Sequence, residues 1–233
     1  MLGLPVFSRH FNALQPNPLS IVKSEHIPRA TIQRLALYVQ VLESFSREGS
    51  EVLSSEVLAK ACNVNPSQIR KDLAYFGEFG VRGVGYFVQD LINSIKQALG
   101  VDRVWKAALV GVGNLGKALL RHQDFPRRGL HIVGAFDCDP FKIGEEVSGL
   151  EVICSRRLKE KVEELGISIG LITTPPERAQ RAANYLVDSG VRGIINFAPA
   201  RINVPDNVYL EYVDFFHHLY AVAFNLTLDG QER

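Results

Sequence analysis

Apolar runs and helical patterns alternate along the second half of this 233-residue chain. Apolar segments that suit buried strands lie at 106–110, 131–136, 167–173, 193–197 and 208–213. Residues 177–189, between two of these segments, have the apolar spacing of a helix. Strands that alternate with helices in this way usually form one parallel sheet. We therefore expect an α/β fold with a doubly wound parallel sheet.

The N-terminal half has helical spacing from its start. A first helix is predicted from Thr31 to Gly49, and its inner face would carry Leu35, Tyr38, Val39, Leu42 and Phe45. A shorter helix follows, with Ser54 or Ser55 as its N-cap, and we expect it to end at Asn63. A helical subdomain therefore precedes the sheet.

A third helix is predicted to begin at Pro66, with Asn65 as its N-cap. Gln68, three residues after the cap, makes this a relative of the capping box. At 100° per residue the inward residues would be Ile69, Leu73 and Phe76, and the outward residues Ser67, Arg70, Lys71 and Ala74. The outer face of this helix is therefore small and basic.

Glycines interrupt residues 79–88, which predicts a hairpin with Arg82 near its tip. Three helices followed by a hairpin are typical of a winged helix-turn-helix, whose third helix enters the major groove of DNA. Residues 27–88 hold seven basic and six acidic residues, so DNA binding would depend on placement rather than on net charge. Gln68 and Lys71 are expected at base edges, and the other residues expected at DNA are Ser67, Arg70, Tyr75 and Arg82. The alternative is a solvated helix face beside a structural hairpin.

The strand at 106–110 runs into a glycine motif, Gly111-Val112-Gly113-Asn114-Leu115-Gly116. Gly111 would allow the sharp turn, Gly113 the close approach of a pyrophosphate, and Gly116 the packing of a helix against the sheet. The next apolar run ends in Asp137, where an acidic residue of a dinucleotide site accepts the ribose hydroxyls. Because a carboxylate there repels a 2′-phosphate, the pattern favours NAD(H) over NADP(H) as the cofactor.

Composition excludes several other classes of protein. The formal net charge is +1, so any nucleic-acid contact must come from a local patch. Cys62, Cys138 and Cys154 lack the spacing of a zinc site or a disulfide framework, so no metal is expected, and Cys138 is most simply a small turn residue. The chain has no apolar run of about 18 residues and no signal peptide, so we expect a cytoplasmic protein without a membrane partner.

The two ends of the chain differ from the rest. Residues 1–26 contain three prolines and a single acid, and we expect a disordered arm. Residues 214–226 form a helix that is apolar almost all round, which predicts burial on both sides at a dimer interface. The expected domains are thus a winged helix at 27–88, a linker helix with a Rossmann domain at 89–213, and a C-terminal helix and tail at 214–233.

Four segments together resemble the Rex family of redox-sensing transcriptional repressors. They are SSEVLAKACNVNPSQIRKDLAYFGEFGVRGVGYFV (54–88), GVGNLGKA (111–118), FDCDPFKIG (136–144) and NFAPARINVP (196–205). The resemblance implies a homodimer that binds two-fold symmetric operator DNA, senses NADH against NAD⁺ and releases DNA with NADH, without catalysis. It also implies a last helix that swaps between protomers. Since the resemblance begins near Ile27 and Met1 is the only methionine, we expect translation to begin downstream of Met1, at Val22.

The resemblance assigns further residues to the cofactor and to a redox switch. Thr174 and Pro175 would approach the nicotinamide side, as would Asp214 and Phe215 at the start of the swapped helix. In the family, an Asp at the position of Asp214 acts with an Arg and a Tyr. This chain has Gln40 and His122 at those two positions, so the residues of the switch differ here.

Two other functions fit parts of the sequence. A nicotinamide-dependent dehydrogenase with an accessory N-terminal domain needs a proton-transfer residue, and His122 is the one candidate near the glycine motif. His217 and His218 are adjacent, so they point to different helix faces and cannot form a metal pair. A CoA-binding module is the other alternative, because domains with a similar glycine turn hold that ligand.

Overall fold

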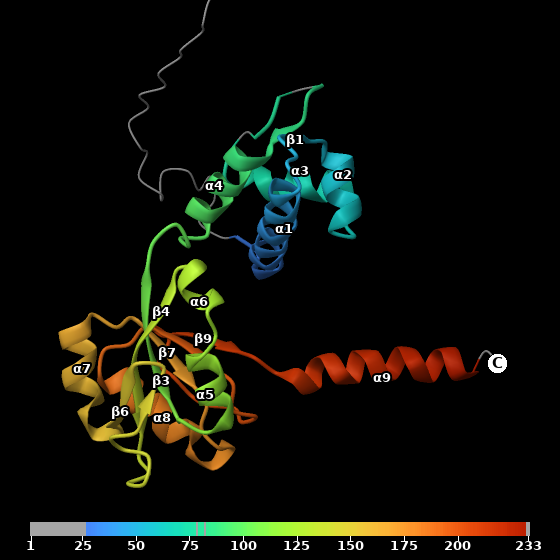
Figure 1. Ribbon diagram of the computed structural model, residues 1–233. Helices are drawn as coiled ribbons and strands as arrows, with labels where there is room; N and C mark the ends of the chain where they lie inside the picture. Colours follow the sequence, from blue (N-terminus) through green and yellow to red (C-terminus); the bar gives the residue numbers. More distant parts are fainter. Residues whose placement is uncertain (1–26, 78, 82, 232–233) are drawn as a thin grey trace, which may run out of the picture. The chain divides into compact units, whose positions relative to one another are not determined.

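The computed structural model describes residues 27–231 except positions 78 and 82 (Figure 1). The chain divides into two compact units at Asp102 and Arg103. The predicted arm at 1–26 and the predicted wing-tip residue Arg82 lie outside the described residues. Each unit has its own hydrophobic core.

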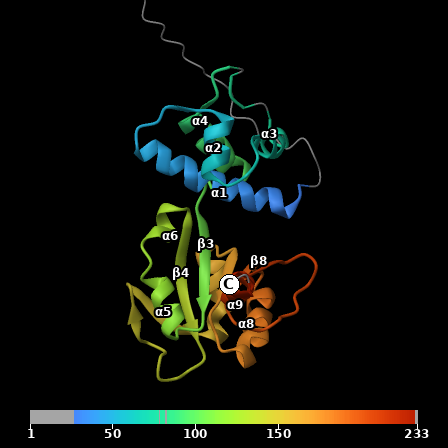
Figure 2. The ribbon, with the colours of Figure 1, turned by 90° about the vertical axis from the view of Figure 1, so that its right-hand side faces the viewer.

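The first unit is a helical domain built on one hydrophobic core. Helix α1 (Arg29–Arg47) contacts α2 (Ser55–Ala61), α3 (Pro66–Ala74) and α4 (Val88–Ala98), as Figure 2 shows. Leu35, Tyr38 and Leu42 of α1 are fully buried, as the helical spacing predicted. The predicted three-helix arrangement of this unit is therefore present.

The helix starts agree with the predicted caps, apart from one side chain. Ser54 Oγ accepts the Val57 N–H at 3.2 Å, and Asn65 Oδ1 accepts the Ser67 N–H at 2.9 Å. Gln68 does not complete the predicted relative of a capping box, because its amide donates to Asp72 Oδ1 at 2.9 Å instead. The buried carboxylate one turn further along competes successfully for this amide.

The predicted hairpin at 79–88 is only partly formed. Val81 and Gly85 make an isolated antiparallel bridge, whereas β2 (Tyr86–Phe87) pairs with β1 (Val52–Leu53) ahead of α2. Gly80, Gly83 and Gly85 all have positive φ, so the segment turns repeatedly instead of forming two regular strands. The wing is thus a glycine-rich loop closed by a short strand pair.

Helix α4 belongs to the first unit. Its apolar face, with Val88, Leu91, Ile92 and Ile95, is buried in the same core as α1. The sequence predicts this segment as a linking helix of the second domain, because its own pattern does not say which core it covers. Its burial moves the boundary between the units from residue 88 to residue 102.

The second unit is a seven-stranded sheet in the order β5-β6-β4-β3-β7-β8-β9. Its strands are β3 (Trp105–Val110), β4 (Leu130–Asp137), β5 (Glu146–Val147), β6 (Leu150–Cys154), β7 (Ile169–Ile172), β8 (Gly193–Asn196) and β9 (Tyr209–Tyr212). All neighbouring pairs are parallel except β5 and β6. The predicted doubly wound Rossmann-type sheet is confirmed, and β5 and β6 are additions at one edge that the sequence pattern did not indicate.

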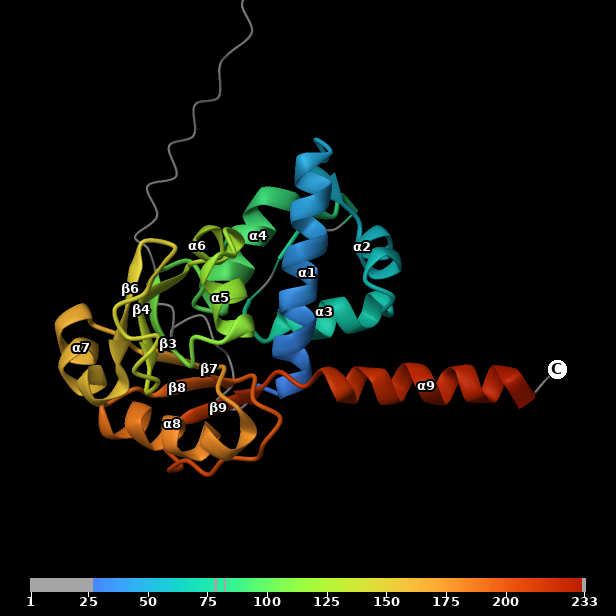
Figure 3. The same cartoon turned by 60° about the horizontal axis from the view of Figure 1, so that its bottom comes forward.

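Helices cover both faces of this sheet (Figure 1, Figure 3). Residues of α7 (Leu158–Leu165) and α8 (Pro176–Asp188) pack in one core, and Leu119 and Leu120, at the end of α5 (Asn114–Leu120), pack against the other. A short helix, α6 (Asp124–Arg127), precedes β4, and a 3₁₀ turn at Ser155–Arg157 precedes α7. The two cores make the three-layer arrangement that a parallel sheet needs.

The last helix, α9 (Phe215–Gln231), lies where a C-terminal helix was predicted, but it extends five residues beyond the predicted end at residue 226. Every side chain described between Phe215 and Asp229 is exposed, although most of them are apolar. The expected burial of both its sides therefore does not occur within a single chain. The swap between protomers stays a prediction.

Candidate functional site

A cavity of about 870 Å³ opens at the carboxyl ends of β3, β4 and β7 in the second unit. This is the edge of the sheet where open α/β folds bind nucleotides. Of the predicted cofactor residues, the ones that line it are Gly111, Gly113, Asn114, Leu115, Asp137, Thr174 and Pro175. Val112 and Gly116 are buried beside it. The glycine motif and the following strand ends therefore form one site.

The three glycines occupy different environments. Gly111 has φ +103°, and a Cβ there would lie 2.8 Å from the backbone of Thr173 and Thr174. A Cβ at Gly116 would collide with the Gly111 carbonyl oxygen, so this glycine allows α5 to pack closely. Gly113 has open space where a Cβ would project. That open space, which faces the cavity, is what the close approach of a pyrophosphate requires.

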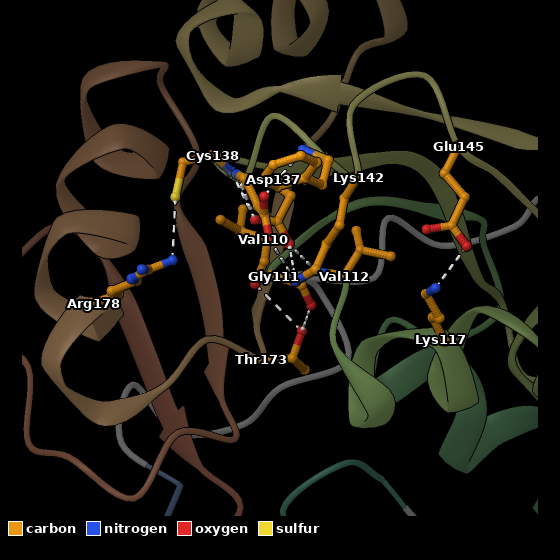
Figure 4. A network of polar contacts seen from close by, with 12 residues as sticks. Val110, Gly111, Val112, Lys117, Asp137, Cys138, Lys142, Glu145, Thr173 and Arg178 are labelled. Carbon is orange, nitrogen blue, oxygen red and sulfur yellow. Dashed lines mark hydrogen bonds and ion pairs between the residues drawn. The ribbon is translucent and has the colours of Figure 1, made fainter.

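Asp137 holds the glycine turn against the end of β4 (Figure 4). Its Oδ2 accepts the Val112 N–H at 2.8 Å and the Lys142 ammonium at 3.1 Å. Its Oδ1 accepts the N–H groups of Cys138 at 2.8 Å and Asp139 at 3.0 Å. Burial by itself would raise the pKa of Asp137, but these donors outweigh it and lower that pKa below its usual value. The carboxylate is therefore ionised and already has four donors.

Because the Asp137 carboxylate already accepts four hydrogen bonds, the predicted contact with a ribose hydroxyl needs a rearrangement of these bonds. A carboxylate has about four acceptor positions, and protein groups fill them here. A ribose hydroxyl that donates to Asp137 must share an oxygen or displace Lys142, the one donor on a flexible side chain. The ribose contact stays a prediction, and Lys142 becomes part of it. The sequence motif did not indicate Lys142, which lies five residues after Asp137.

The loop after β7 supplies two threonines with different roles. Thr173 Oγ1 donates to the Gly111 carbonyl at 2.7 Å and so ties β7 to the glycine turn (Figure 4). Thr174 Oγ1 is buried and has no hydrogen-bond partner among the described residues. A buried hydroxyl without a partner is costly. Its place in the cavity lining suits a hydroxyl that a polar ligand satisfies.

Cationic side chains dominate the charged lining of the cavity. Lys142, Arg156, Arg178 and Arg181 line it, with Asp137 as the acidic residue. Arg178 Nη1 lies 3.6 Å from the Cys138 sulfur (Figure 4), and Arg181 donates to the Tyr185 hydroxyl at 2.9 Å. This excess of positive charge suits an anionic ligand such as a pyrophosphate.

The three residues predicted for the switch are exposed, with Gln40 in the first unit and His122 and Asp214 in the second. Gln40 lies on α1. His122 Nδ1 accepts the Asp124 N–H at 3.4 Å, and its ring lies 4.8 Å from that of Phe125. Asp214 Oδ1 accepts the Phe216 N–H at 2.9 Å at the start of α9. Asp214 and Phe215 do not line the cavity, so their approach to the cofactor stays a prediction.

The outer face of α3 is exposed as predicted. Ser67, Arg70, Lys71 and Ala74 are exposed, and Ile69, Leu73 and Phe76 are buried. Arg70 Nη1 donates to Ser55 Oγ at 2.9 Å, which fixes this guanidinium near the start of α2. Tyr75 is half-buried at the end of the helix. Basic side chains therefore project from the helix that a winged-helix protein places in the major groove.

Comparisons with known proteins agree with this division. The family described as "Putative DNA-binding protein N-terminus" matches residues 26–74, and the one described as "CoA binding domain" matches residues 102–200. The redox-sensing transcriptional repressor Rex of Solidesulfovibrio magneticus is 76% identical over 91% of this chain and 96% of its own length. That of Maridesulfovibrio salexigens is 71% identical over 88% of this chain and 99% of its own length.

The chain belongs to the Rex family of redox-sensing transcriptional repressors. A solved Rex-family repressor, RSP in complex with β-NAD⁺ and operator DNA, matches with a TM-score of 0.84 and 33% identity, covering 89% of this chain and 96% of that one. The same protein with β-NADH gives a TM-score of 0.82 at 32% identity, covering 89% of this chain and 98% of that one. The predicted family and fold are thus confirmed, and these relatives are named as repressors rather than dehydrogenases.

The described residues contain neither a candidate membrane span nor a candidate metal-binding cluster. Among the helices within residues 27–231, no stretch is both long and apolar enough to span a bilayer. Within the same part of the chain, His, Cys, Asp and Glu side chains nowhere gather in a group of three that could hold a metal ion.

Proposed function

We propose that this chain is a transcriptional repressor that binds operator DNA as a homodimer and leaves it when NADH binds the second unit. The observation that carries the proposal is that one chain contains both a candidate DNA-binding helix and a candidate cofactor cavity. A helix with an exposed basic face and a cavity built on a dinucleotide-binding glycine turn occur together, across a length shared with Rex repressors. The protein would act in the cytoplasm, where it meets operator DNA.

The cavity supports NAD(H) as the sensed ligand. The open space at Gly113 accommodates a pyrophosphate, and the surrounding cations offset its charge. The unpartnered Thr174 hydroxyl and the neighbouring Pro175 lie where the second half of the cofactor would extend. Asp137 would select the unphosphorylated ribose. No step of chemistry is needed, since sensing requires only that a ligand bind two states of the protein differently.

The DNA contacts would come from the outer face of α3 and from the wing. Lys71 is the candidate for a base edge, and Ser67 and Arg70 would contact phosphates. Tyr75 would contact the flanking backbone, and Arg82 would lie in or beside the minor groove. The contact between Arg70 and Ser55 supports its assignment, because it holds the guanidinium in place before DNA arrives.

Helix α9 supports the homodimer. Phe215, Tyr220, Phe224 and Leu226 expose between 64% and 73% of their surface. A helix that is apolar on all sides is stable in water only when another surface buries it. A second copy of the chain that exchanges the same helix would bury the helices of both protomers. The exchange would also bring Asp214 and Phe215 to the partner's cavity.

The decisive experiment measures binding to a duplex that the protein selects from a random-sequence pool. NADH, NAD⁺ and CoA are added separately at equal concentrations. We expect NADH to release the DNA and NAD⁺ to leave most of it bound. Release by CoA alone would support the CoA-binding alternative, and oxidation of NADH by a carbonyl substrate would support a dehydrogenase. Failure to select any duplex would overturn the repressor.

Asp214 and His122 would form the switch across the dimer. A carboxylate near the nicotinamide distinguishes the cationic ring of NAD⁺ from the neutral ring of NADH. His122 would pair with Asp214 in this arrangement. Gln40 stands where the family resemblance implies an Arg, so Asp214 would lack that partner. NADH-induced release is measured for wild type, Asp214→Asn and His122→Tyr. A normal NADH response of His122→Tyr makes the histidine a bystander, and a normal NADH response of Asp214→Asn leaves that residue only a cap.

A further inference from the structure

A buried carboxylate lies on the inner side of the proposed recognition helix. Asp72 of α3 is 1% exposed and stands beside Lys71 in sequence. Arg34 donates from Nε to its Oδ2 at 2.6 Å and from Nη2 to its Oδ1 at 2.7 Å. Thr31 Oγ1 donates at 3.1 Å and the Tyr38 hydroxyl at 2.8 Å. Together with the Gln68 amide at 2.9 Å, these bonds fill the acceptor positions of the carboxylate.

The donors come from one face of α1 and from α3 itself. Thr31, Arg34 and Tyr38 lie three and four residues apart, so they project from the same side of α1. Arg34 meets the carboxylate with a two-pronged contact, which fixes orientation as well as distance. The bonds therefore set how far α3 can slide along α1 and how far it can rotate about its own axis.

Rotation of this helix matters because Lys71 acts at the end of a long side chain. If α3 turned by about 20°, an atom roughly 8 Å from its axis would move by about 3 Å. A hydrogen bond to a base edge tolerates only a few tenths of an ångström. The same rotation would barely alter contact with the diffuse charge of the DNA backbone. A helix held less firmly would thus lose specific binding before it loses non-specific binding.

Gln68 is part of this arrangement. A bidentate contact with adenine needs both the NH₂ and the carbonyl of a glutamine turned toward the base. Here Nε2 is turned to the buried carboxylate, four residues along the same helix. The side chain is also half-buried, unlike those of Ser67, Arg70 and Lys71.

We propose that Asp72 is the positioning residue of the recognition helix, oriented by Arg34 and Tyr38 of α1, and that Gln68 serves this carboxylate rather than a base pair. This inference rests on the proposed DNA-binding function. It replaces the expectation that Gln68 reads a base edge. Tyr38 is the sharpest probe, because a residue that is 0% exposed cannot itself contact DNA.

The experiment compares Tyr38→Phe and Gln68→Met with wild type on the duplex selected by wild type, on its single-base variants, and on a random duplex. Both changes remove one hydrogen bond to Asp72 and keep most of the side-chain volume. Gln89→Met is the matched control, since Gln89 makes a similar bond to Asn93 four residues along α4. The fraction of active protein is set by titration with excess duplex, so that lost folding is not counted as lost affinity.

We expect affinity for the selected duplex to fall about three- to tenfold in both variants, which is the size of effect that the net contribution of one typical hydrogen bond corresponds to. Affinity for random DNA, the salt dependence and NADH affinity should stay unchanged, and Gln89→Met should match wild type. The double variant should lose less than the product of the two factors, because both act through Asp72.

Other results would overturn the inference. Gln68→Met could relax the sequence preference at a single base pair while Tyr38→Phe keeps wild-type affinity and specificity. That result would show that Gln68 contacts a base. Equal losses on selected and random DNA would make the network a purely structural one. If wild type itself selects no duplex, the proposed function fails before this comparison begins, so the two failures are distinguishable.

Discussion

Asp72 in the first unit and Asp137 in the second are both buried carboxylates, yet different kinds of group hold them. Asp72 receives its hydrogen bonds from side chains, three of which lie 34 to 41 residues earlier in the sequence. Asp137 receives three of its four from backbone N–H groups, at Val112, Cys138 and Asp139. The hydrogen bonds of Asp72 thus depend on which side chains face it, whereas most of those of Asp137 depend on the path of the backbone.

The electrostatics of the two carboxylates are similar. Burial would raise the pKa of Asp72, but the hydrogen bonds, that from Arg34 above all, lower it below its usual value. The pKa of Arg34 is raised by the same contact. The pKa of Asp137 is also lowered, but there the main causes are hydrogen bonds from backbone N–H groups together with the contact to Lys142, and no arginine takes part. A single substitution of a donor can therefore break the first arrangement, but among the donors of Asp137 only Lys142 can be removed in this way.

The largest expected effect is on the stability of the first unit. Arg34→Met leaves the buried Asp72 carboxylate without its cation, which should cost about 3 kcal/mol of unfolding free energy. Hydrogen exchange of the α1 and α3 amides in the full chain measures it. The control is Lys96→Met. Lys96 of α4 forms an ion pair of 2.6 Å with Glu43, which lies on α1 as Arg34 does, and both side chains of this pair are about one-third exposed. We expect at most about 1 kcal/mol there. Equal losses would contradict a special role for the buried pair.

The next effect concerns the cavity. Asp137→Ala removes the acceptor that holds Val112 and the turn after β4, so the glycine turn should loosen and NADH affinity should fall at least about tenfold. Calorimetric titration with NADH measures the change. Asp139→Ala is the control, because that side chain accepts the Phe141 N–H at 3.0 Å and does not line the cavity. NADH binding by Asp137→Ala at wild-type affinity would show that the turn keeps its shape without the carboxylate.

Lys142→Met tests how the Asp137 charge is used. The ammonium at 3.1 Å from Asp137 Oδ2 offsets the repulsion between that carboxylate and a 2′-phosphate. Removing it should weaken NADPH binding about tenfold more than NADH binding, because the Coulomb term changes mainly for the additional phosphate. Dissociation constants for both cofactors give the ratio. An unchanged ratio would mean that the phosphate does not approach Asp137.

The smallest effect is the pH dependence of stability. A carboxylate whose pKa is lowered by folding stabilises the protein above its unfolded pKa of about 3.9, and this contribution disappears as pH falls through the folded pKa. Acid should therefore destabilise both units below about pH 4, and each tenfold difference between the folded and unfolded acid dissociation constants contributes about 1.4 kcal/mol. Asp72→Asn should have a lower starting stability and a flatter acid limb for α1 and α3 in hydrogen exchange. An acid limb as steep as that of wild type would assign the dependence to other groups.

Local patterns in the sequence were enough to predict most of the elements and the location of the cavity. Periodicity predicted α1, α8 and the strands β3, β4, β7, β8 and β9, because one face or both sides of each are buried and the apolar spacing records this. The role of Gly116 was predictable because a Cβ there would collide with the carbonyl of nearby Gly111. The role of Gly111 followed from the glycine motif, although the backbone that its Cβ would meet belongs to the distant residues Thr173 and Thr174. The position of Asp137 followed from the same motif, but the motif did not indicate that the Lys142 ammonium contacts its carboxylate.

Contacts between distant segments decided the rest. Asp72 falls next to two exposed basic residues, and nothing local indicates that its carboxylate is buried against Arg34 and Tyr38 of another helix. For the same reason Gln68 reads as a cap or a base contact until the fold places that carboxylate beside it. The core to which α4 belongs and the pairing of β2 with β1 also depend on which surfaces meet. The sequence by itself determined the fold class, the glycine turn and the basic outer face of α3, since each depends on neighbouring residues. The tertiary structure decided the partners of the buried charges, because a carboxylate removed from water takes its hydrogen bonds from whatever the fold brings to it.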